Sequence, residues 1–237
     1  GSPDGACYFY ADSRNTELTW NDSKHCLNTC DNAMSNTIAQ AVDGAKFGIW
    51  NDQPEIGSMC DHPSAHSKGM VCYNDDGGFV LNVTTPHFPV NISNPGDSPA
   101  GCQDDNNLKA AQQFFCMSFD MDNLKKWGAA AKHAQLCGVQ PWSANDILEM
   151  KVPDKDAKEL KCLPNVPLQT RGGVDITLTI KSGWENYNPW SIVSAGVGAP
   201  LQVASWTTTT SSSAGWGSAP CYPGSKGLKQ IVTMGDK

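Results

Sequence analysis

The 237-residue chain lacks three features that would each point to a familiar class of protein. None of its ten cysteines lies in a CxxC pair, so the spacing of a zinc ribbon is absent. Basic residues are in deficit, with 17 Lys and Arg against 24 Asp and Glu and a net charge of −7. This balance excludes a general affinity for nucleic acid at neutral pH, although a local basic groove stays open. No run of about 18 apolar residues is present, which argues against a membrane protein.

The cysteines are even in number and dispersed singly, a pattern that favours disulfides formed in an oxidising compartment. Tripeptides with the acceptor pattern for N-glycosylation begin at Asn21, Asn82 and Asn91. Together these features predict a secreted glycoprotein, with an acidic, lysosome-type compartment as the less favoured location. The chain has no signal peptide and is expected to be the mature, soluble form. Cys102 and Cys116 bracket a loop and are a candidate disulfide pair.

Local patterns predict a layered fold that mixes strands and helices. Helical spacing indicates helices over residues 35–45, where a serine is the N-cap candidate, and 121–136, directly after Asp120. The proline-rich segment 138–170 is the expected junction between two halves. β-rich runs bounded by Gly, Pro, Asn and Asp predict strands at residues 46–50, 69–73, 78–85, 113–119, 174–180, 201–206 and 229–234. The alternation of the two element types predicts an α/β or α+β fold.

His66 and Lys68 are the first candidates for chemistry. Alternate residues of an extended segment point to the same side, so both side chains can face one ligand while Ser67 faces away. An imidazole can attack phosphorus or transfer a proton, and an ammonium group can neutralise phosphate oxygens in the transition state. This chemistry requires no metal and no cofactor. A His-x-Lys spacing also arises by chance, so a surface pair without a function is the alternative interpretation.

Two further sets of residues lie close to this pair in the sequence. Asn51 and Asp52 are candidates for shaping the site, because an Asn-Asp pair before proline can orient a neighbouring backbone or histidine. A zinc site is the other alternative, but it is disfavoured because its cysteine is expected to lie in a disulfide. Its candidate ligands are Cys60, Asp61, His62 and His66.

Five motifs resemble the deoxyribonuclease II family in both order and spacing. They are WNDQP (50–54), HSKG (66–69), DGGF (76–79), PHFP (86–89) and QFFCMSF (113–119). The resemblance is specific over residues 5–120 and looser over residues 172–206. Within the family, the chain is similar to the secreted deoxyribonuclease II-like glycoproteins of parasitic nematodes.

The resemblance implies a phospholipase D-like fold, in which two similar halves each contribute a His-x-Lys motif to one site. In such enzymes one histidine acts as nucleophile, the other acts as general acid, and the lysines hold the phosphate. DNA is then cut at acid pH without a metal, leaving 3′-phosphate ends. Applied to this chain, residues 1–163 form the first half and carry the His66-Ser67-Lys68 motif. Residues 164–237 form a shortened second half, and the fold is expected to be trimmed at both ends.

The expected second motif departs from the family pattern. No histidine follows His133, and the best match is Gly224-Ser225-Lys226, with Gly224 at the histidine position and Lys226 at the lysine position. Little or no nuclease activity is therefore expected, because nucleophile and general acid act together.

Two other functions stay open. One is an active acid endonuclease, with a site completed by a second copy of the chain. The other is a binding protein for a host or immune partner on a nuclease scaffold. Binding of DNA or another phosphate ligand is expected to be weak and mainly at acid pH. A monomer is expected rather than a homodimer.

Overall fold

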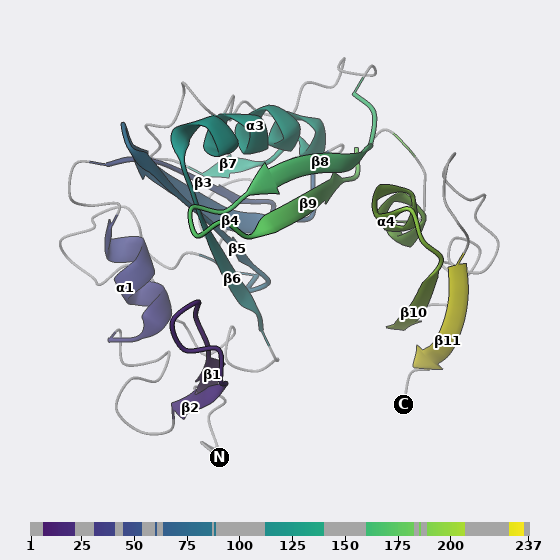
Figure 1. Ribbon diagram of the computed structural model, residues 1–237, viewed down its shortest axis with the longest axis horizontal. Coiled ribbons are helices and arrows are strands. Elements are labelled where there is room, and N and C mark those ends of the chain that lie inside the picture. The colour runs from purple at the N-terminus through teal and green to yellow at the C-terminus, as the bar shows by residue number, and fades with distance from the viewer. Residues whose placement is uncertain are drawn as a thin grey trace.

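The fold is mixed α/β, in agreement with the sequence (Figure 1). The computed structural model describes residues 7–21, 31–40, 45–53, 60, 64–86, 88, 112–139, 160–182, 185, 189–206 and 228–234. Over these residues the strands form one five-stranded sheet and three two-stranded sheets. No helix in the described part of the chain is long and apolar enough to cross a membrane.

The five-stranded sheet is antiparallel throughout, and its strand order is β6-β5-β4-β3-β7. Its strands are β3 (Lys46–Asn51), β4 (Lys68–Asn74), β5 (Gly77–Val83), β6 (Phe114–Phe119) and β7 (Gly138–Val139). The four longer strands confirm the predictions to within about two residues. Gly77 begins β5 with a φ of 130°, and an added Cβ would lie 2.3 Å from the Phe119 carbonyl oxygen. Only glycine therefore fits this turn.

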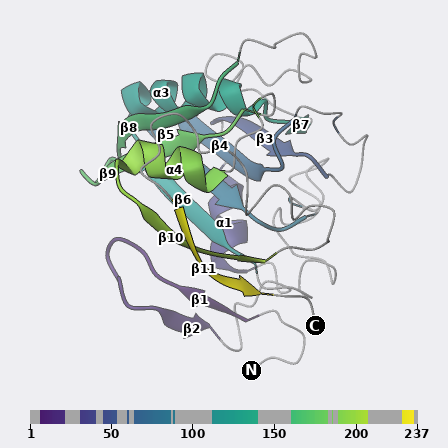
Figure 2. The same cartoon turned by 90° about the vertical axis from the view of Figure 1, so that its right-hand side faces the viewer.

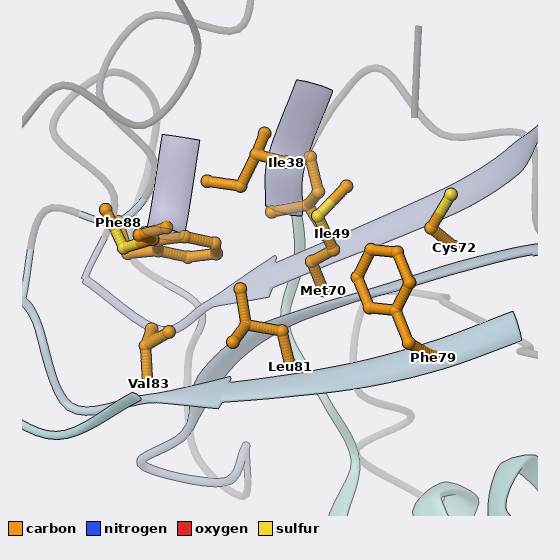
Figure 3. Packing of buried hydrophobic residues seen from close by; sticks show 9 residues of the cluster. Ile38, Ile49, Met70, Cys72, Phe79, Leu81, Val83 and Phe88 are labelled. Carbon is orange, nitrogen blue, oxygen red and sulfur yellow. The ribbon is translucent and has the colours of Figure 1, made fainter. Parts of the chain in front are cut away.

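One face of the sheet packs against helix α1 (Ala33–Ala39). The side chains converge between the helix and strands β3, β4 and β5 (Figure 3). Burial raises the pKa of the Cys72 thiol to about 11, so this cysteine is a core residue and not a nucleophile at neutral pH. The buried members of this first cluster are Met34, Ile38, Ile49, Met70, Cys72, Phe79, Leu81, Val83 and Phe88.

The opposite face is covered by helix α3 (Met121–Ala131) and by a hairpin of β8 (Leu163–Gln169) and β9 (Asp175–Ile180). Trp50 and Trp127 meet there with ring centroids 5.6 Å apart. Asp120 caps α3 by accepting from the backbone N–H of Asn123. That hydrogen bond is the main reason that the pKa of Asp120 is lowered. Helix α3 thus begins where the sequence predicts, and the 3-10 helix η3 (Lys132–Ala134) continues it.

Helix α1 corrects the prediction of a helix over residues 35–45 with a serine cap. The cap is Asn32, whose side chain accepts from the backbone N–H groups of Met34 and Ser35. Ser35 lies at the third helical position, where its hydroxyl accepts from the Asn32 N–H and completes a capping box. The helix ends at Ala39.

The remaining described elements are β1 (Tyr8–Tyr10), β2 (Thr19–Asn21), α4 (Pro189–Val197), β10 (Leu201–Trp206) and β11 (Leu228–Met234). Strands β10 and β11 confirm their predictions and pair in parallel. With α4, they stand on the side of the β8–β9 hairpin that is away from α1 (Figures 1 and 2). The division of the chain into residues 1–163 and 164–237 stays a prediction.

Candidate functional site

The His-x-Lys motif lies where β4 begins, beside the end of β3. Lys68 is the first residue of β4, and its register partner is Asn51, the last residue of β3. Both residues belong to the face of the sheet that packs on α1. The Lys68 side chain is only 4% exposed, and its Nζ lies 2.6 Å from Oδ1 of Asp52. A buried ammonium group needs such a partner, because desolvation of a lone charge costs several kcal/mol.

Asp52 also connects the motif's histidine to this ion pair. Its second carboxylate oxygen, Oδ2, lies 3.7 Å from Nε2 of His66, whose side chain is 76% exposed. The same imidazole nitrogen lies 3.4 Å from Oε1 of Gln53. The structure therefore brings His66 and Lys68 together on one carboxylate, with the imidazole in solvent and the ammonium group behind it. At 3.7 Å the contact with Asp52 is an ion pair for a protonated ring, longer than the hydrogen bond that orients the histidine base of hydrolases.

Asn51 holds this corner of the sheet together through its side chain. It is fully buried, and Nδ2 donates to the carbonyl oxygens of Pro86 at 2.7 Å and Phe88 at 2.6 Å. Its Oδ1 accepts from the backbone N–H of Gln53 at 2.7 Å. Both amide protons and the amide oxygen are thus used within the protein. Asn51 shapes the site by fixing the chain around Asp52, and its amide protons are not available to a ligand.

Trp50 supports the motif from the opposite face of the sheet. Its Nε1 donates to Oγ of Ser67 at 3.0 Å, so the central residue of the motif points away from His66 and Lys68. Its indole ring lies over Gly69, where an added Cβ would be 2.4 Å from Cζ2 of the ring. In the sequence, Trp50 stands out only as part of the WNDQP motif, and this role is not evident. The sequence carries no local signal for it, because the register that sets Trp50 opposite Gly69 joins two separate strands.

Replacing Gly69 by alanine is expected to destabilise the protein by about 1–3 kcal/mol, because the new methyl group overpacks a buried site. The new methyl carbon would also lie 2.3 Å from the carbonyl oxygen of Leu81, which the backbone of β5 holds in place. Equilibrium unfolding in urea measures the loss. Gly172→Ala is the matched control, because the nearest atom to its added Cβ is 3.9 Å away. Equal losses for the two variants would contradict the expectation.

A disulfide between Cys60 and Cys137 ties the segment before the motif to strand β7. Two backbone hydrogen bonds continue this connection: Asn51 N–H donates to the Cys137 carbonyl at 2.9 Å, and Ala65 N–H donates to the Gln135 carbonyl at 3.2 Å. Gln135 has a φ of 54°, which turns the chain from η3 into β7. Cys60 is therefore a crosslink and not a zinc ligand. In the described part of the chain, no group of three or more His, Cys, Asp and Glu side chains could hold a metal ion.

Several predicted residues lie outside the described ranges, namely Asp61, His62, Asn91, Gly224, Ser225 and Lys226. Of the other acceptor asparagines, Asn21 ends β2 and Asn82 lies within β5. Cys116 carries a free thiol, so the Cys102–Cys116 pair is wrong. His133 lies on η3, and its Nδ1 donates to the Lys161 carbonyl oxygen at 2.8 Å.

The chain is similar to one family model and to several curated proteins. The family model described as Deoxyribonuclease II matches residues 1–215. Deoxyribonuclease-2-alpha of Rattus norvegicus is 26% identical over 85% of this chain and 60% of its own length. The mouse protein of the same name is 24% identical over 86% of the chain and 60% of its own length.

Plancitoxin-1 of Acanthaster planci is 26% identical over 55% of the chain and 36% of its own length. The chain thus spans less than two thirds of the length of these curated relatives. No solved structure matches it. The similarity to nematode proteins stays a prediction.

Proposed function

Because the chain belongs to the deoxyribonuclease II family, we propose that His66 and Lys68 form one half of a site for a DNA phosphate, and that this chain alone cleaves DNA weakly or not at all. The observation that carries the proposal is the arrangement around Asp52. It places an exposed imidazole and a buried ammonium group beside the two oxygens of one carboxylate. Solvent and a phosphodiester can reach His66 without a change in the fold.

The roles of the two residues follow from their positions. His66 is suited to attack phosphorus or to transfer a proton, since its ring is accessible and its Nε2 faces the Asp52 carboxylate. Lys68 lies behind the imidazole in an ion pair with Asp52, and its ammonium group offsets the negative charge that this carboxylate would otherwise present to a phosphate. Residues 134–237 contain no histidine that could take the place of the second catalytic histidine. We place Gly224 at that position, with Lys226 as the second lysine.

Hydrogen bonds connect the motif to the backbone of two lysines, despite the acidic composition of the chain. Ala65, next to His66, is bonded to Gln135, three residues after Lys132. His133 is bonded to Lys161, so η3 brings this second lysine to the same end of the molecule. Both lysines are exposed. They support a local basic surface beside the motif that contacts the DNA backbone.

The test combines DNA binding with cleavage at pH 5 in the presence of a chelator. We expect a fluorescently labelled duplex to bind at low salt and to bind more weakly as salt rises. The logarithm of the binding constant should fall with the logarithm of the salt concentration, with a slope of about −0.9 per phosphate contact. Lys132→Ala and Lys161→Ala are each expected to reduce that slope by about one unit. Lys125→Ala, on the exposed side of α3, is the control and should leave it unchanged. An absence of binding at low salt would overturn the proposed site.

Cleavage of plasmid DNA under the same conditions tests the second part of the proposal. We expect the cleavage rate of the unmodified chain to differ little from that of the His66→Ala variant. The difference should be far smaller than the roughly 10²–10⁴-fold that one acid-base group contributes in a complete site. Robust, His66-dependent cleavage would instead identify an active endonuclease. Its mass in solution would then distinguish a monomer from a dimer that shares two His66 side chains.

We also place the protein in the secretory pathway, as an extracellular monomer. The support is the Cys60–Cys137 disulfide, since such crosslinks form and persist in oxidising compartments. The three acceptor tripeptides are compatible with the same route.

A further inference from the structure

A large exposed aromatic residue lies beside an acceptor asparagine on the five-stranded sheet. Asn82 in β5 is the register partner of Phe115 in β6, and its neighbour on the other side is Gly69 in β4. Residues directly opposite each other in antiparallel strands project from the same face, with Cβ atoms about 4.5–5.5 Å apart. Phe115 is 53% exposed and Asn82 is partly exposed. The phenyl ring is therefore within reach of any group attached to the Asn82 amide.

The hydrophobic core does not account for this exposed ring. On the same face of β6, Met117 and Phe119 pack into the cluster beneath α3 and the β8–β9 hairpin. Phe115 lies at the N-terminal end of the strand, which extends beyond that hairpin (Figure 1). A single exposed aromatic residue is ordinary on a protein surface. What distinguishes Phe115 is its position opposite an acceptor asparagine.

We propose that Asn82 carries an N-linked glycan whose first N-acetylglucosamine packs on the ring of Phe115. The Asn82-Val83-Thr84 tripeptide supplies the acceptor. The donor is an oligosaccharide linked to a lipid diphosphate. The Asn82 amide nitrogen forms a bond to the anomeric carbon of the first sugar, the bond from that carbon to the diphosphate oxygen breaks, and the lipid diphosphate leaves. One amide proton is lost to the medium.

The hydroxyl of Thr84 indicates when the sugar is transferred. In the folded protein, its Oγ1 donates to Oε1 of Gln112 at 2.7 Å and accepts from the backbone N–H of Gln113 at 2.8 Å. The hydroxyl that the transferase must engage is thus already used by the segment that leads into β6. The transfer therefore takes place on the nascent chain, before β5 pairs with β6. The sugar then lies against Phe115 when the sheet forms.

Packing of a sugar on the ring removes apolar surface from water and holds two adjacent strands together. An aromatic contact of this kind corresponds to a rise in Tm of about 2–4 °C in a protein of this size. The effect depends on both partners, because the glycan without the ring, or the ring without the glycan, has nothing to pack against. This coupling separates the proposed contact from a general solubilising effect of the sugar.

The experiment is a double-mutant cycle on full-length chain secreted from eukaryotic cells. Four forms are compared by thermal unfolding: the unmodified chain, Asn82→Gln, Phe115→Ala and the double variant. Each form is also weighed by mass spectrometry before and after an amidase removes its N-linked glycans. The unmodified chain must lose the mass of one glycan more than Asn82→Gln loses. Phe115→Ala is expected to lower Tm by about 2–4 °C more in the glycosylated background than in the Asn82→Gln background.

Two controls make the result specific. Trimming to a single N-acetylglucosamine should keep the coupling, whereas complete removal should abolish it. Phe9→Ala, which removes another exposed phenylalanine from strand β1, should lower Tm equally in both backgrounds. An absent glycan at Asn82, or equal effects of Phe115→Ala in the two backgrounds, would overturn the proposal. Neither outcome depends on whether the protein binds DNA.

Discussion

Replacement of Asp52 by alanine is expected to lower the free energy of unfolding by about 3–5 kcal/mol, because it leaves a buried charge without its partner. The Lys68 side chain is 4% exposed and its Nζ lies 2.6 Å from Asp52. Water cannot replace the carboxylate at that depth without opening the corner where β3 ends and β4 begins. Equilibrium unfolding in urea at neutral pH measures the loss as a shift in the transition midpoint.

A second variant tests whether the loss comes from the orphaned charge. Asp52→Ala combined with Lys68→Met removes both charges and keeps an unbranched side chain of similar length. This double variant is expected to recover most of the stability, since replacing a buried ion pair by apolar groups is often neutral or stabilising. His66→Ala should change stability by about 0.5 kcal/mol or less, because its side chain is 76% exposed. If the double variant were as unstable as Asp52→Ala, the ion pair would not be the cause.

Loss of the Cys60–Cys137 disulfide is expected to cost about 2–5 kcal/mol, the usual range for a native disulfide. The two residues are separated by 77 positions, so the crosslink restricts a long loop in the unfolded chain. The variant for this test is Cys60→Ser/Cys137→Ser, unfolded under non-reducing conditions. Cys116→Ser is the matched control, because that cysteine is exposed and carries a free thiol. Its effect should be about 0.5 kcal/mol or less.

The same variant should also loosen the site locally. Asn51 N–H and Ala65 N–H donate to carbonyls of the segment that the disulfide holds, at Cys137 and Gln135. Hydrogen exchange at these two amides is expected to become faster relative to the amide of Val71, in the centre of the sheet. A uniform change at all three amides would show that the crosslink acts on global stability alone.

Much of the central sheet could be predicted from local sequence. Its four longer strands are β-rich runs separated by Gly, Asn and Asp, and this punctuation reflects turns such as the one at Gly77. Strand β8 was missed because Pro164 and Pro167 lie within it. Among the described residues it pairs with β9 alone, so one of its edges has no strand partner there and proline is tolerated. The start of α1 was missed because Asn32 and Ser35 are both good caps, and their reciprocal hydrogen bonds decided between them.

The sequence by itself determined the family, the mixed fold class and the candidate residues His66, Lys68, Asn51 and Asp52, because motif order and strand spacing are local properties of the chain. It did not determine that Asp52 joins the histidine to the lysine, that Trp50 holds Ser67, or that Cys60 pairs with Cys137. Those contacts join residues that are 14 to 77 positions apart, and side-chain burial sets their energies. Only the pairing of β3 with β4 and β7 brings them within reach, so the tertiary structure decided them.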